Sequence, residues 1–288
     1  MNVFSIKTVL YTVFALLAFA GNSVFCRLAL SENKIDAASF TTIRLLSGIV
    51  VLAVILKMAK VEASTTSKGN WKASFMLFIY AVTFSYAYTT LETGIGALVL
   101  FASVQMTMIA ASLFTGNKLH YLEWVGVLTA FSGFVYLVFP DLSTPSLMGF
   151  VLMAISGIAW GMYTLFGRGS NNPLSDTAYN FLCTLPFMLV LTAVTFQQAT
   201  LSWDGVLLAV LSGGIASGIG YTIWYIALGG LSITQAAVVQ LLVPAIAAIG
   251  GLLFADETLS YRLVLSSLII LGGILVVIMG RHSSIQRE

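Results

Sequence analysis

Ten apolar segments, each about 18–22 residues long, run through the 288-residue chain and constrain its fold more than any other feature. A helix of this length crosses the ~30 Å hydrocarbon core of a bilayer while satisfying its own backbone polar groups. Only 8% of the residues are Asp, Glu, Lys or Arg, whereas soluble domains carry about 25%. We therefore predict an all-α integral membrane protein with ten transmembrane helices. The expected spans are residues 9–30, 37–58, 73–90, 97–114, 123–139, 148–166, 178–196, 206–227, 233–254 and 261–280.

Several classes of function lack their characteristic residues in this sequence. Cys26 and Cys183 both fall within expected spans and form neither a disulfide framework nor a CxxC metal motif. The sequence contains no P-loop, no nucleophile elbow and no pair of carboxylates in mid-span. The net charge of +2 needs no nucleic-acid partner to explain it. We therefore expect no enzyme activity, no catalytic or metal-binding residues and no cofactor.

The basic residues predict the orientation in the membrane. Nine of the thirteen Lys and Arg residues fall before the first span or in loops on the same side as the N-terminus. On the opposite side lie Arg27, Lys34 and Arg262. Positively charged loops stay in the cytoplasm. We therefore expect a multi-pass protein of a bacterial-type inner membrane with both termini cytoplasmic.

The ten spans read as one five-helix pattern that occurs twice. An offset of 140 residues places Asp36 opposite Asp176 and Gly133 opposite Gly273. Such a constant offset indicates an internal duplication. Because each copy has an odd number of spans, the second copy must enter the membrane inverted, an arrangement typical of alternating-access transporters. The two repeats are predicted to be residues 1–140 and 141–288.

Four features resemble those of a known family. They are the Trp160-Gly161-x-Tyr163 motif, Arg44 in the second span, Pro244 within the ninth, and the Asp256–Ser260 loop. Together they resemble the EamA-type ten-helix branch of the drug/metabolite transporter superfamily. The resemblance implies a central cavity lined by spans one to four and six to nine. Spans five and ten would then lie at the periphery, in internal packing or in a homodimer contact.

The first half departs from this family pattern. Phe19-Ala20 stands where the motif has Trp-Gly, Val104 is opposite Pro244, and Asn117 is opposite Glu257.

Arg44 is the sharpest candidate for function because a cation deep in hydrocarbon costs about 2.5–3.5 kcal/mol on the insertion scale. Arg44 should face the interior of the bundle and pair with another side chain. We expect this partner to be Glu92, at the outer end of the third span, because both residues lie towards the non-cytoplasmic side. The pair could be a structural tie or a gate, and Arg44 could instead anchor an anionic solute. Arg27 lies nearer the membrane boundary and can extend its charge towards water.

Polar and aromatic side chains within the spans are the other candidates for contacts with solute. Uncharged polar groups in hydrocarbon need partners, so each could equally bond a neighbouring helix. A mid-span tryptophan is not explained by an interfacial belt. The predicted substrate-binding set is Asn22, Arg44, Tyr88, Gln105, Trp160, Tyr163, Tyr221, Tyr225 and Gln240.

Two prolines and two pairs of glycines concern helix geometry. Pro186 and Pro244 lie inside spans seven and nine, where proline removes a backbone hydrogen bond and acts as a static kink or a hinge. The pairs Gly157/Gly161 and Gly214/Gly218 have GxxxG spacing and predict close approach between helices.

The combined prediction is a secondary transporter of the inner membrane that moves a small solute by alternating access. The resemblance implies export of small metabolites such as amino acids or related amphipathic compounds. Uptake or exchange of a nucleotide-like or other anionic metabolite is the alternative. A non-transporting membrane enzyme or lipid-handling protein is a third, and it predicts a cavity that opens sideways to lipid.

Overall fold

The computed structural model describes residues 6–59, 69–114, 121–138, 145–167, 170–231 and 233–285. Helices make up nearly all of this part of the chain, and the described residues of the expected spans lie largely within them. Spans one to six are the helices α1 (Ile6–Leu30), α2 (Ala37–Met58), α3 (Trp71–Tyr88), α4 (Thr93–Phe114), α5 (Tyr121–Val138) and α6 (Leu147–Phe166). The rest comprise α7 (Pro173–Leu182), α8 (Leu185–Thr195), η2 (Phe196–Gln198), α9 (Trp203–Val210), η3 (Leu211–Ile219), α10 (Gly220–Leu228), α11 (Ile233–Gln240), α12 (Val243–Phe254) and α13 (Tyr261–Ile285).

Eight helical segments in the described part of the chain are long and apolar enough to cross a membrane. The apolar part of α5 is shorter, at Tyr121–Leu137, and α3 is not among the eight. The composition of α3 explains this, because it includes three tyrosines and two serines. Four of these five polar side chains, Ser74, Tyr80, Ser85 and Tyr88, are buried inside the bundle.

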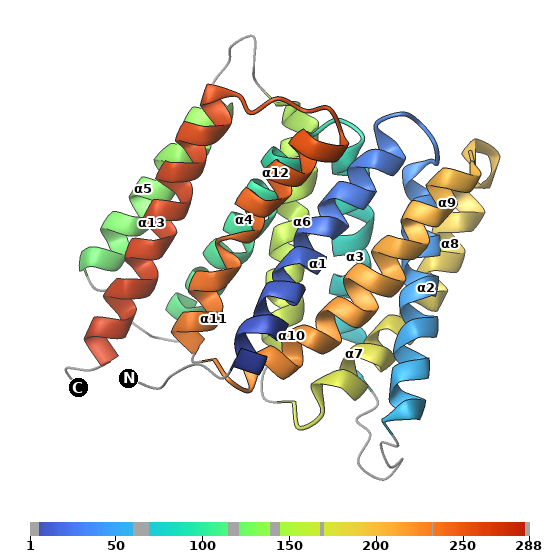
Figure 1. Ribbon diagram of the computed structural model, residues 1–288, viewed down its shortest axis with the longest axis horizontal. Coiled ribbons are helices and arrows are strands. Elements are labelled where there is room, and N and C mark those ends of the chain that lie inside the picture. Colours follow the sequence, from blue (N-terminus) through green and yellow to red (C-terminus); the bar gives the residue numbers. More distant parts are fainter. Residues whose placement is uncertain are drawn as a thin grey trace.

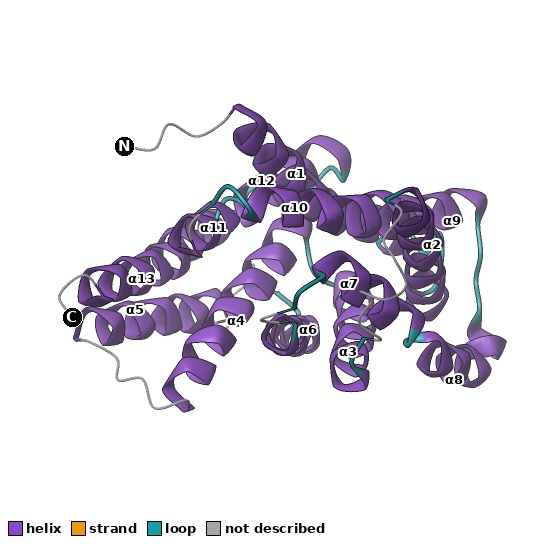
Figure 2. Ribbon diagram, turned by 90° about the horizontal axis from the view of Figure 1, so that it is seen from below, coloured by secondary structure: helices purple, strands orange, loops and turns teal. Residues whose placement is uncertain are grey.

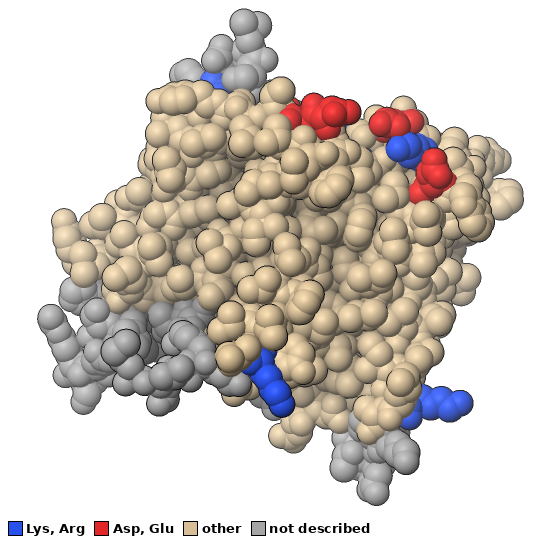
Figure 3. All heavy atoms as spheres, viewed as in Figure 1, with Lys and Arg blue, Asp and Glu red and all other residues tan. Residues whose placement is uncertain are grey.

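Apolar side chains cover much of the surface, and polar ones lie inside. Val50, Leu128 and Val194 are among many large apolar side chains that are mostly exposed, whereas Arg44 and Ser212 are buried. A lipid solvent favours this arrangement. The charged side chains seen in Figure 3 lie at the upper and lower edges of the molecule.

Helices α5 and α13 pack together at one side of the bundle (Figures 1 and 2). Their contact is close because Gly126 and Gly273 face it; a Cβ on Gly273 would lie 2.5 Å from the backbone nitrogen of Ala130. The remaining helices form the larger part of the molecule. In it α3 packs along α6, α4 packs against α6 and α12, and α1 packs against α9, η3, α10 and α12.

Glycines also hold other pairs of helices close together. Gly157 and Gly161 of α6 face Ser103 and Thr107 of α4, and Gly218 of η3 faces Val51 of α2. The predicted close approach at both GxxxG pairs is confirmed, since Gly214 also faces Val51.

Side-chain caps mark where several helices begin. Asp36 accepts a hydrogen bond from the backbone nitrogen of Ser39 at the start of α2, as Asn70 does at α3 and Ser146 does at α6. Asp36 also accepts from the backbone nitrogen of Thr200 at 2.9 Å, so the α1–α2 connection is held against the connection before α9. Burial opposes ionisation of Asp36, but these hydrogen bonds lower its pKa below the usual value.

Candidate functional site

Arg44 lies in the interior of the bundle, as its position in an apolar span predicts. Its side chain is 2% exposed, and its Nη2 donates a hydrogen bond of 2.8 Å to the hydroxyl of Tyr80. The guanidinium carbon lies 5.1 Å from the centre of the Tyr80 ring and 4.8 Å from that of Phe84. Within the described structure, Nη1 is buried without a hydrogen-bond partner.

The expected pairing of Arg44 with Glu92 is wrong. Arg27 pairs with Glu257, and Lys34 pairs with Glu32. Glu92 lies in the connection between α3 and α4, where the charges that act on it are those of Glu257 and Arg27. Glu92 does not pair with Arg44 because the carboxylates of Glu92 and Glu257 lie at the end of the bundle, whereas the Arg44 side chain points inward and contacts Tyr80.

Tyr80 joins side chains from four elements into one network. Its hydroxyl accepts from Arg44 of α2 and, at 3.3 Å, from the Asn22 Nδ2 of α1. The Asn22 Oδ1 in turn accepts a 2.6 Å hydrogen bond from Ser212 of η3. We name Asn22, Arg44, Tyr80 and Ser212 the central polar network. Tyr80 and Ser212 are absent from the predicted set, although Tyr80 lies at the middle of its span.

The η3 segment is a π-helix, and it brings Ser212 to this network. Its sequence is rich in small residues, Leu211-Ser212-Gly213-Gly214-Ile215-Ala216-Ser217-Gly218-Ile219. A Cβ on Gly213 would overlap the backbone carbonyl oxygen of Arg44, so glycine is required where η3 meets α2. The Ser217 hydroxyl donates to the Ser212 carbonyl at 2.9 Å, which satisfies a backbone acceptor in the irregular segment. Segments of π-helix occur frequently at functional sites.

Aromatic rings surround the central polar network. The Trp160 ring centre is 4.8 Å from that of Tyr80, 5.2 Å from Tyr163 and 5.1 Å from Tyr221. The structure thus brings five members of the predicted set into one region: Asn22, Arg44, Trp160, Tyr163 and Tyr221. Aromatic faces attract cations and stack on planar groups.

Four other predicted residues lie apart from this network. Tyr88 is at the end of α3, where it is fully buried and its hydroxyl donates to the Thr93 carbonyl at 3.3 Å. Tyr225 shares a 3.0 Å hydrogen bond with Thr177 of α7. Gln105 and Gln240 are half-buried on α4 and α11, and no hydrogen bond links them to the network in the described structure.

Pro186 and Pro244 coincide with breaks in two spans. One break separates α7 from α8, and the other separates α11 from α12. At the second break, Leu241 and Leu242 donate to the carbonyls of Val238 and Val239 at 3.1 Å, which forms a tighter turn. Proline has no N–H for the carbonyl four residues earlier, so Pro244 leaves the Gln240 carbonyl without its usual helical donor. The predicted disruption of both helices is confirmed, whereas their role as hinges stays a prediction.

A second charged site lies at the upper end of the bundle in Figure 1, where α1 and α3 end and α4 begins. The Arg27 Nε donates to Glu257 Oε1 at 3.0 Å, and its Nη1 donates to the Tyr88 carbonyl at 3.2 Å. The two oxygens of Glu257 also accept from the Thr93 backbone nitrogen at 3.0 and 2.8 Å. Burial and the charge of Glu257 raise the pKa of Glu92 here, although Arg27 opposes the shift. Asn117, the counterpart of Glu257 in the first half, lies outside the described residues.

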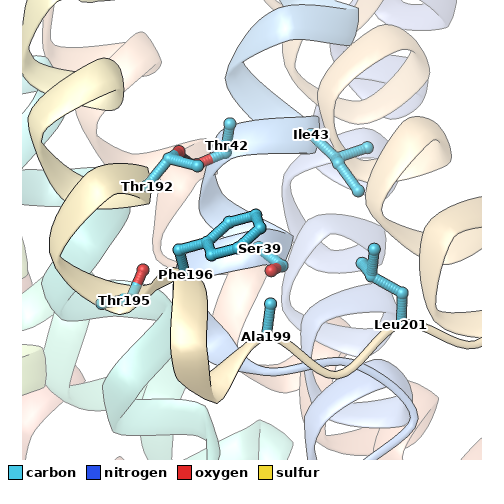
Figure 4. A pocket seen from close by; sticks show the side chains of 8 residues that line it. All are labelled: Ser39, Thr42, Ile43, Thr192, Thr195, Phe196, Ala199 and Leu201. Carbon is cyan, nitrogen blue, oxygen red and sulfur yellow. Dashed lines mark hydrogen bonds between the residues drawn. The ribbon is translucent and has the colours of Figure 1, made fainter.

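A hollow of about 150 Å³ opens between α2 and α8 (Figure 4). It is lined by Ser39, Thr42, Ile43, Thr192, Thr195, Phe196, Ala199 and Leu201. Thr42 and Thr192 approach each other across it, with their hydroxyl oxygens 3.3 Å apart. Two residues along a helix turn the side chain by about 200°, so Thr42 and Arg44 point to opposite sides of α2. The hollow is therefore separate from the central polar network.

The described residues contain no group of three or more His, Cys, Asp or Glu side chains placed to hold a metal ion. The chemistry available at the centre is instead one guanidinium, one amide and several hydroxyls, surrounded by aromatic rings. Such a set can bind a small polar molecule with an anionic group and an apolar body.

The EamA-like transporter family model matches the chain twice, over residues 6–139 and 147–279. The chain belongs to this family. It is therefore a multi-pass membrane protein of a transporter family and a member of the drug/metabolite transporter superfamily.

Relatives agree with this membership. An uncharacterized protein of Pseudomonas aeruginosa is 46% identical over 282 residues, 98% of each chain. The threonine/homoserine exporter RhtA of Escherichia coli is 22% identical over 263 residues, covering 88% of this chain and 84% of RhtA. One solved crystal structure has a TM-score of 0.63, covers 94% of this chain and 96% of that chain, and is 18% identical. This last likeness concerns the fold alone.

Proposed function

We propose that this EamA-family protein exports a small amino-acid-like metabolite from the cytoplasm by alternating access. The observation that carries the proposal is the state of Arg44. A cation buried in a membrane protein without a carboxylate partner is costly. A solute carboxylate beside its free Nη1 would supply the missing acceptor. The aromatic rings of Trp160 and Tyr221 would then contact the rest of the solute.

Alternating access requires two halves that move against each other, and we propose residues 1–140 and 141–288 as inverted repeats. The order of packing supports this, because α3 packs on α6 while α9, η3 and α10 pack on α1. In Figure 1, α1 starts at the lower side of the bundle and α6 starts at the upper side. We propose that the lower side, where α1 starts and α13 ends, faces the cytoplasm, in agreement with the distribution of basic residues.

The network residues have distinct roles in this proposal. Arg44 binds the anionic group of the solute, and Asn22 and Ser212 offer hydrogen bonds to its other polar groups. Tyr80 holds Arg44 in place. The breaks at Pro186 and Pro244 act as hinges when the site changes sides.

The test is transport by purified protein in liposomes. Threonine and homoserine are suitable first probes because RhtA, which is similar to this chain, exports them according to its name. We expect flux of at least one amino acid, competition between related ones, and loss of flux in Arg44→Met. Absence of flux across a broad amino-acid panel, with the protein shown to be folded, would reject an amino-acid substrate.

A different anion is the second candidate, because Arg44 would bind any carboxylate or phosphate. Liposomes preloaded with nucleotides or other anionic metabolites test it, since an exchanger would take up labelled solute only against a preloaded partner.

A lipid-handling protein is the third candidate, and the lateral hollow between α2 and α8 is the observation in its favour. Because that hollow lies on the face of α2 opposite Arg44, it gives lipid no access to the central polar network. The Arg44→Met variant separates the readings, as only a solute carrier needs this side chain.

A further inference from the structure

The Arg27–Glu257 contact joins segments that are far apart in the sequence. Arg27 is near the end of α1, Thr93 starts α4, and Glu257 lies in the connection between α12 and α13. Glu257 therefore neutralises a guanidinium and also occupies the positive N-terminal end of a helix. Its carboxylate has little room, because a Cβ on Gly251 of α12 would overlap Glu257 Oε2.

This contact is largely shielded from solvent. The side chains of Arg27 and Glu257 are 18% and 10% exposed, in contrast to the Lys34–Glu32 pair, in which Glu32 is 65% exposed. Exposed pairs contribute little, whereas a shielded pair with additional backbone partners holds its elements together more firmly.

The contact also lies on the way from the upper end of the bundle to Arg44. Cys26, the neighbour of Arg27 in α1, is 0% exposed. Tyr88 is fully buried, and its carbonyl accepts from Arg27. Its ring packs edge-on against Phe84 with the ring centres 4.8 Å apart, and the Phe84 ring centre lies 4.8 Å from the guanidinium carbon of Arg44. A solute that leaves Arg44 in this direction must displace these groups.

We propose that Arg27, Glu257 and the Thr93 end of α4 form the outer gate of this transporter. In the closed state, Arg27 and the α4 N-terminus hold the α12–α13 connection over Cys26 and Tyr88. In the open state, Glu257 separates from Arg27 and the central polar network reaches the outer solution. This inference rests on the proposed alternating access and assigns a role to Arg27 and Glu257 that the solute-binding residues do not share.

Cys26 is a native reporter of this gate. In a Cys183→Ser background it is the sole thiol, and a membrane-impermeant maleimide reacts with it only when the path is open. The reagent is applied from each side of the membrane in turn. We expect Arg27→Gln and Glu257→Gln each to raise the labelling rate from the outer side by at least about tenfold, because a lost charge-assisted hydrogen bond weakens the closed state. Lys34→Gln is the matched control and should leave the rate unchanged.

Two results would overturn the gate. One is an unchanged labelling rate in Arg27→Gln and Glu257→Gln. The other is an equal increase in Lys34→Gln, which would show a general effect of charge. Arg27→Lys should fall between wild type and Arg27→Gln, because it keeps the charge and loses the two directed bonds.

Folding and function are separated by further measurements. If the glutamine variants fail to fold, the wild-type protein is labelled during active flux, and a rate that does not change with solute overturns the gate. If the glutamine variants expose Cys26 while the wild type moves no solute, the gate stands and the proposed transport function falls. If the wild type transports solute but the variants label like wild type, transport stands and the gate falls.

Discussion

Replacing Arg44 by methionine separates a solute anchor from a structural tie. The interactions lost are one hydrogen bond from a charged group, worth about 1.5–3 kcal/mol, and cation–π contacts worth about 2 kcal/mol when desolvated. The change also removes the cost of keeping a cation in hydrocarbon, about 2.5–3.5 kcal/mol. These terms nearly cancel, so we expect the free energy of unfolding to fall by only about 1 kcal/mol, or a Tm lower by about 2–4 °C.

A structural ion pair would behave differently. Removing one partner of a buried pair costs about 3–5 kcal/mol, which corresponds to a fall in Tm of about 6–20 °C in a chain of this size. Flux should respond much more strongly than stability. Losing one partner of a buried charged contact costs about 2–5 kcal/mol, so Arg44→Met should lower flux at limiting solute by roughly 30-fold or more.

The assay combines thermal unfolding of the purified protein with flux in liposomes that contain equal amounts of each variant. Arg44→Lys is the companion variant. It keeps the positive charge without the planar fork of donors, and it should retain part of the flux. Normal flux in Arg44→Met would refute the anchor. A Tm loss above about 10 °C would indicate that Arg44 has a structural partner after all.

Four further changes test other parts of the structure. Gly273→Ala should lower Tm by the equivalent of about 1–3 kcal/mol because its Cβ would meet α5; Gly272→Ala, with open space around it, should be neutral or stabilising in the same thermal scan. Gly213→Ala should lower both Tm and flux, since its Cβ overlaps an α2 carbonyl. Tyr80→Phe should reduce flux by about tenfold or more by leaving two donors unpaired, and wild-type flux would contradict the network. Glu92 has a raised pKa, so its stabilising effect is present at pH 4 and is lost as pH rises through that pKa; Glu92→Gln should therefore raise Tm above wild type at pH 8 and match it at pH 4.

The helices and the burial of Arg44 could be predicted because each follows from a single strong constraint. Backbone polar groups in lipid must bond within a helix, so apolar segments of this length become helices whatever surrounds them. An arginine about two turns into an apolar span must avoid lipid, which places Arg44 inside without knowledge of its neighbours. The prolines in spans seven and nine likewise act through their own missing N–H groups.

The partners of Arg44 could not be predicted because they depend on how helices rotate and tilt against each other. The sequence places Arg44 and Glu92 towards the same side of the membrane. In the structure, however, the Arg44 guanidinium points into the bundle, and the charges that act on Glu92 are those of Arg27 and Glu257. Depth alone would have favoured Tyr80 over Tyr88, since Tyr88 is the last residue of α3. The network was missed because it joins Asn22 of α1 to Ser212 of η3, 190 residues later.

The irregular backbone lies in the second half of the described chain, whereas α1 to α4 are continuous helices. The π-helix η3 and the breaks before Pro186 and Pro244 each leave backbone groups outside the regular α-helical pattern. Such groups are tolerated in a membrane only where protein or water satisfies them. The first half supplies the guanidinium of Arg44, the amide of Asn22 and the phenol of Tyr80 to the network, on continuous helices. This division favours a mechanism in which the first half holds the solute and the second half, through η3 and its broken helices, changes shape around it.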